Sequence, residues 1–65
     1  MREVGRQDSI AAAQDGLARV HEAEGRPDLA LPLAQAALAI YERLRDGSVA
    51  TTRALVERLR KAADG

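Results

Sequence analysis

The feature that most constrains the fold is a helical pattern between Gln14 and Leu44, interrupted by one Gly-Arg-Pro-Asp corner at residues 25–28. Apolar residues recur at spacings of three and four on both sides of this corner, as they do in amphipathic helices. Gly25 can take the left-handed conformation that ends a helix. Pro27 suits the first turn of the next helix, where its missing N–H is not needed. The pattern therefore predicts a helical hairpin.

The rest of the chain extends this prediction to an all-α fold. Valine, isoleucine and threonine never alternate with polar residues over the length of a strand. Gly47 and Ser48 form a second stop and restart. We expect three helices, over about residues 9–24, 27–45 and 49–63, with Asp8 or Ser9 as the first cap. Residues 1–7 are expected to form a flexible leader, followed by a single domain at residues 8–65.

The composition restricts both stability and chemistry. A chain of 65 residues without cysteine and with a single histidine has no disulfide, no thiolate site and no histidine-rich zinc site. Its net charge of zero argues against binding dominated by nucleic-acid electrostatics. No apolar run approaches the roughly 20 residues that span a bilayer, and no secretory signal begins the chain. We expect a cytoplasmic protein without a membrane partner, and the preference for arginine over lysine is typical of GC-rich bacterial genomes.

The second helix is predicted to be the middle layer. Its apolar side chains fall into one broad arc, with further leucines on nearly the opposite side, so it should be covered on two sides. We expect these residues of it to be largely inaccessible: Leu33, Ala37, Leu38 and Ile40. The first helix is expected to pack through the stripe Ile10, Ala13, Leu17 and Val20, and the third through Leu55, Leu59 and Ala62. Gly16 weakens the first helix, which suggests close approach of a backbone or ligand, or a tolerated weakness.

The hairpin resembles a tetratricopeptide repeat. The residues that carry the resemblance are Gln14, Leu17, Ala18 and His21 on the first helix, Gly25 at the turn, and Ala30, Ala34 and Ala37 on the second. The segment ALAIYERLRDG is similar to the longer, kinesin-light-chain-type repeats of actinobacterial proteins. Gln14, His21 and Ala34 depart from the large or aromatic residues of that signature, and Arg60 stands where a small residue would be expected.

The resemblance implies a non-catalytic protein–protein interaction module that binds a peptide or a helical segment of a partner. The residues that it places on the binding groove are Asp15, Gly16, Arg19 and Glu22 of the first helix. We expect Arg58 and Lys61 of the basic third helix to contact the partner as well. Arg19 would favour an acidic partner, because a guanidinium pairs with a carboxylate through two bonds. A solvated helix face with an ordinary Asp15–Arg19 pair explains the same residues without any ligand.

Two other functions compete with this one. The chain could form a homodimer through exposed leucines of the second or third helix, as a structural self-association domain. It could also contact nucleic acid through the basic third helix, although no aromatic residue interleaves the charges there. We expect no enzyme activity, no cofactor and no metal, because the sequence has no phosphate loop, nucleophile elbow or metal-spaced carboxylate pair.

Overall fold

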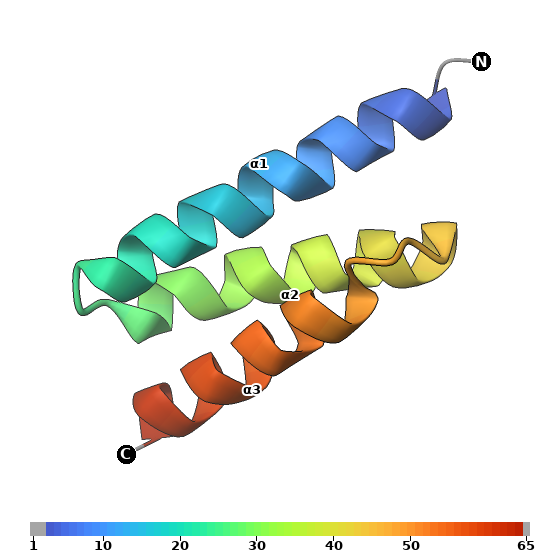
Figure 1. Ribbon diagram of the computed structural model, residues 1–65. Helices are drawn as coiled ribbons and strands as arrows, with labels where there is room; N and C mark the ends of the chain where they lie inside the picture. Colours follow the sequence, from blue (N-terminus) through green and yellow to red (C-terminus); the bar gives the residue numbers. More distant parts are fainter. Residues whose placement is uncertain (1–2, 65) are drawn as a thin grey trace.

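The computed structural model describes residues 3–64, which form three helices (Figure 1). They are α1 (Glu3–Ala23), α2 (Pro27–Leu44) and α3 (Val49–Asp64). The described residues include no strand, so the all-α prediction is confirmed. The bounds of α2 and α3 agree with the predicted ranges to within a residue. Helix α2 runs through Pro32 without interruption.

Helix α1 begins well before its predicted start near residue 9. It is helical from Glu3, so Asp8 and Ser9 lie inside it and neither caps it. Residues 3–7 of the predicted leader belong to this helix, and residues 1 and 2 of the leader lie outside the described part of the chain.

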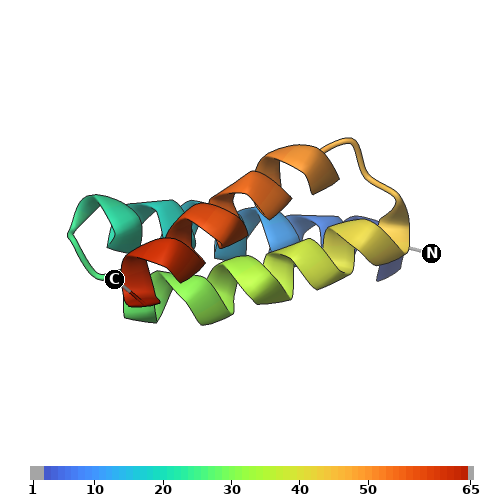
Figure 2. The ribbon, with the colours of Figure 1, turned by 90° about the horizontal axis from the view of Figure 1, so that it is seen from below.

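Helix α2 lies between the other two helices, as predicted (Figure 1). Both α1 and α3 pack extensively against it, whereas they contact each other little. Helices α1 and α3 run in one direction and α2 in the opposite one, so the end of α3 returns to the start of α2 (Figure 2). The molecule is elongated along the helices, with extents of 41 × 18 × 13 Å.

The corner between α1 and α2 ends the first helix as the sequence predicted. Gly25 has a φ of 78°. Its N–H donates to the Glu22 carbonyl at 3.0 Å, and the Arg26 N–H donates to the His21 carbonyl at 2.9 Å. This pair of bonds is the Schellman motif, which satisfies carbonyls that the helix end would otherwise leave without donors.

The corner between α2 and α3 uses the same motif without a glycine. Arg45 has a φ of 56°, and its N–H donates to the Glu42 carbonyl at 3.2 Å. The next N–H, from Asp46, donates to the Tyr41 carbonyl at 3.0 Å. The Asp46 side chain also accepts a bond of 2.8 Å from the Ser48 N–H, just before α3 begins. The prediction of Gly47 as the stop residue is therefore wrong, because Arg45 holds the left-handed position instead.

The two corners should respond in opposite directions to substitution. A Cβ at Gly25 would meet no atom within 4 Å, so Gly25→Val is destabilising through backbone conformation alone, by about 1–2 kcal/mol. Arg45→Gly relieves the left-handed backbone strain of a residue that carries a Cβ, and the greater conformational entropy of glycine in the unfolded chain offsets part of this gain. The net effect should be a stabilisation of about 0.5–1 kcal/mol. Thermal or urea unfolding of the two variants checks both signs. Destabilisation by Arg45→Gly would show that the Arg45 side chain contributes more than its backbone strain costs.

The core contains many alanines where helices meet. One cluster joins Ala18 of α1 to Ala30 and Ala34 of α2 and to the apolar residues of α3. The other joins Ala11 of α1 to Ala37 and Tyr41 of α2. Each of these alanines is completely inaccessible. Since alanine adds little bulk, the axes of α1 and α2 can approach closely. The largest completely buried side chains belong to α3: Leu55, Leu59 and Thr52.

The predicted packing stripe of α1 is wrong. Ile10, Leu17 and Val20 are 44%, 48% and 50% exposed, and Ala13 is exposed as well. The helix packs through Ala11 and Ala18 instead, which lie about 130° further round its axis at 100° per residue. The smaller residues face α2 because they permit the closer helix contact.

The burial predicted for α2 is correct only in part. Ala37 is fully buried, but Leu33, Leu38 and Ile40 are only partly buried at the edges of the two core clusters. Their positions flank the alanine row that forms the centre of both contacts. On α3, Leu55 and Leu59 are buried as predicted, whereas Ala62 is exposed.

Candidate interaction site

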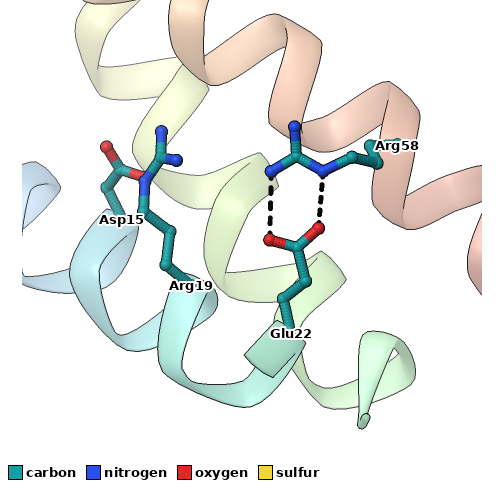
Figure 3. Close-up of polar contacts among 4 residues, drawn as sticks. All are labelled: Asp15, Arg19, Glu22 and Arg58. Atoms are coloured by element: carbon teal, nitrogen blue, oxygen red, sulfur yellow. Dashed lines mark hydrogen bonds and ion pairs between the residues drawn. The ribbon is translucent and has the colours of Figure 1, made fainter. Parts of the chain in front are cut away.

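Of the predicted groove residues, Glu22 of α1 and Arg58 of α3 bind each other, and Asp15 and Arg19 pair within α1. Figure 3 shows Asp15, Arg19 and Glu22 of α1 on the side of that helix from which Glu22 reaches Arg58 of α3. Lys61 lies one turn beyond Arg58 and is exposed.

A two-bond ion pair links the two outer helices (Figure 3). Arg58 Nε donates to Glu22 Oε2 at 2.6 Å, and a terminal nitrogen of Arg58 donates to Glu22 Oε1 at 3.0 Å. The hydrogen bonds from Arg58 lower the pKa of the Glu22 carboxyl below its ordinary value, with a further contribution from the positive charges of Arg58 and Arg19. Because α1 and α3 share few other contacts, this pair is the main polar connection between them among the described residues.

The second pair lies within α1. Arg19 Nε donates to Asp15 Oδ1 at 3.0 Å, with Arg19 half-exposed and Asp15 largely covered. Residues four apart on a helix are neighbours, so this contact requires no ligand to explain it. An acidic partner at Arg19 or Arg58 would have to share or displace a carboxylate that is already bonded.

Gly16 does not mark a close contact within the chain. It is exposed, and a Cβ built on it would meet no atom within 4 Å. The expectation that a neighbouring backbone approaches Gly16 is therefore wrong for the isolated chain.

The basic charges of α3 are also partly compensated. Arg53 donates to Glu42 of α2 at 2.9 Å, and Arg58 is bonded to Glu22. Arg60 and Lys61 are exposed. Two of the arginines on which a nucleic-acid contact would rest are thus committed to carboxylates of this chain.

Among the described residues, no group of three or more His, Cys, Asp or Glu side chains could hold a metal ion. His21 is partly buried, and its Nδ1 lies 3.5 Å from Glu24 Oε1.

The surface that sequence reasoning missed is the exposed apolar face of α1. Periodicity identifies the stripe of Ile10, Ala13, Leu17 and Val20 but wrongly assigns it to the core. The signal that could have corrected this is a second apolar line, Ala11 and Ala18, seven residues apart on another side of the helix. We call the four exposed residues Ile10, Ala13, Leu17 and Val20 the outward stripe.

The Glu22–Arg58 pair should make stability depend on acid pH. Since the folded-state pKa of Glu22 is lowered, the pair stabilises the fold above the ordinary glutamate pKa of about 4.3 and stops doing so as the pH falls through the folded value. Glu22→Gln should therefore lower Tm slightly between about pH 6 and 8, and the difference from wild type should vanish at the acid end of the titration. Glu57→Gln, at an exposed position of α3, is the matched control. A difference that persists unchanged in acid would mean that the carboxylate charge is not the cause.

Comparison of the chain with protein-family models, with curated proteins and with solved structures found no match. Within the described residues, no helix has both the length and the apolar character that crossing a membrane requires.

Proposed function

We propose that the chain is a non-catalytic protein–protein interaction module of tetratricopeptide type, which docks a helix of its partner on the outward stripe of α1. The single observation that carries this proposal is the exposure of that stripe: three large apolar side chains, each close to half exposed, lie on one helix face. Contiguous exposed apolar surface of this kind marks interaction sites in soluble proteins.

The packing of α3 supports a helical partner. Thr52, Leu55 and Leu59 of α3 are buried against α2, and they follow the same spacing of three and then four as Ile10, Ala13 and Leu17. The outward stripe thus repeats the pattern by which this chain already attaches one helix to another. The burial of the small positions Ala18, Ala30, Ala34 and Ala37 supports the repeat-like register as well.

The groove between α1 and α3 receives less support as the binding surface. Its charged residues are engaged in the Glu22–Arg58 and Asp15–Arg19 pairs. The leucines that were candidates for self-association on α3, Leu55 and Leu59, are completely buried within the chain. The apolar face of α1 is therefore the surface on which we base the proposed function.

Site-specific photo-crosslinking tests this proposal. A photoreactive amino acid at position 13, within the stripe, should give defined protein adducts in cells that produce the protein. One at position 57, an exposed position of α3, should not. Leu17→Glu should abolish the adducts, and Ala39→Glu, which adds the same charge to an exposed residue of α2, should leave them.

The folding of Leu17→Glu must be checked alongside. Because Leu17 is 48% exposed in the isolated chain, the free energy of unfolding of the variant in dilute solution should lie within about 1 kcal/mol of the wild-type value. Equal adducts at positions 13 and 57, or none at either, would contradict the proposal. Unfolding of dilute Leu17→Glu would do so too, because the stripe would then belong to the core.

A further inference from the structure

We infer that a second copy of this chain can occupy the outward stripe, with two α1 helices packed antiparallel around a two-fold axis at the level of Asp15. This inference rests on the proposed function and specifies the partner. Its basis is that the stripe has the spacing of a helix-packing seam and is complementary to itself in one orientation, in the size of its side chains.

The spacing of the stripe is that of a coiled-coil seam. Ile10, Ala13, Leu17 and Val20 follow one another at three, four and three residues, as a and d positions do in two successive heptads. These side chains are exposed together on one face of α1, where no other part of the described chain covers them. A second helix could therefore insert its side chains between them.

Antiparallel pairing places Leu17 opposite the small Ala13 and sets two β-branched residues, Ile10 and Val20, opposite each other. Asp15 is midway between Ile10 and Val20 and also midway between Ala13 and Leu17. A two-fold axis at this level therefore sets Ile10 against Val20 of the second copy, and Leu17 against Ala13 of the second copy, and then repeats both layers in reverse. Parallel pairing would set Leu17 against Leu17 and Ala13 against Ala13, which leaves one crowded layer and one void.

The residues beside the seam permit close approach. Ser9, Gly16 and Ala23 line one flank at intervals of seven, and all three are exposed. Gly16 lies next to the axis, where a Cβ would meet nothing in the isolated chain and where the two backbones of the dimer would come closest. Arg19 lies well round the helix from the stripe and is bonded to Asp15. The exposed charge in line with the stripe is Glu24, seven residues after Leu17 and just beyond the end of the seam, where it lies 3.5 Å from His21.

The contact is short, which determines how it must be measured. From Ile10 to Val20 the seam extends for about 15 Å of helix, at the small end of specific interfaces. We therefore expect a monomer in dilute solution and a dimer that forms reversibly as the concentration rises from about 10 μM to 1 mM. Sedimentation equilibrium over this range gives the dissociation constant directly.

Complementary charge variants test both the surface and the orientation. Ile10→Lys alone and Val20→Glu alone should each remain monomeric, because each dimer would bury two unpaired charges. Their equimolar mixture should form a heterodimer in the antiparallel arrangement. There the lysine introduced at position 10 of one chain meets the glutamate introduced at position 20 of the other, and the unchanged Val20 meets the unchanged Ile10. Parallel pairing offers no such match, since each charge would face an apolar residue.

Two further variants complete the experiment. Leu17→Glu should abolish the dimer and Ala39→Glu should keep it, with circular dichroism showing that both are folded. The inference is overturned if wild type stays monomeric at about 1 mM, if Leu17→Glu still dimerises, or if the charge variants fail to associate on mixing. If position 13 crosslinks to a different protein and the wild-type chain stays monomeric, self-pairing is overturned and the proposed function is retained. If there are neither adducts nor a dimer, both are overturned.

Discussion

Leu55→Ala is expected to leave most of the chain unfolded at room temperature. Leu55 is completely buried and is among the largest side chains that are, so its truncation should destabilise the fold by about 2–5 kcal/mol. A core of this size supplies about 3–5 kcal/mol in total. Circular dichroism should show the loss of helix, and urea titration should show the loss of a cooperative transition.

The matched control for this substitution is Leu29→Ala. It removes the same atoms from a leucine that is 43% exposed, and it should lower the free energy of unfolding by less than about 1 kcal/mol. If Leu55→Ala gave a native-like transition close to that of Leu29→Ala, the core would not lie between α2 and α3.

Ala18→Leu is expected to have the second largest effect, because it adds bulk where α1 and α2 touch. Ala18 is completely inaccessible and packs in the same cluster as Ala30 and Ala34. A larger side chain must push the helices apart or adopt a strained rotamer, at a cost of about 1–3 kcal/mol. Thermal unfolding should show a clearly lower Tm.

Ala13→Leu makes the same chemical change on the outward stripe and serves as its control. Ala13 is exposed, and leucine is nearly as good a helix former as alanine, so its Tm in dilute solution should stay close to that of wild type. Similar losses in both variants would show that α1 is packed on both faces. A neutral Ala18→Leu would show that the two helices are further apart than the alanine contact requires.

The elements of this fold could be predicted from the sequence because they depend on local signals. Gly25 and Pro27 determine the first corner through backbone preferences that hold in any context. The broad apolar arc of α2 correctly placed that helix between the other two. The second corner was harder to locate, since Arg45 takes a left-handed conformation that sequence preferences assign to the nearby Gly47.

The orientation of α1 could not be predicted, because periodicity shows which residues share a face and not which face is buried. Leu17 and Ala18 are adjacent in sequence and both belong to apolar lines. Area burial favours turning Leu17 inward, but close packing of α1 against Ala30 and Ala34 favours Ala18. The second effect prevails because the alanine surface of α2 is matched by another small residue. A similar limit applies to Glu22, because its pairing partner Arg58 lies on a separate helix and sequence spacing does not connect the two.

Both the fold and the interaction surface depend on the orientation of α1, in which Ala18 is buried and Leu17 is exposed. The chain has no cysteine, so Leu17→Cys and Ala18→Cys each introduce a single thiol at neighbouring positions. The rate of alkylation in dilute native solution measures access to each. We expect rapid labelling at position 17, and slow labelling at position 18 that accelerates to the unfolded rate in urea. The reverse order, with position 18 reactive and position 17 protected, would contradict this orientation.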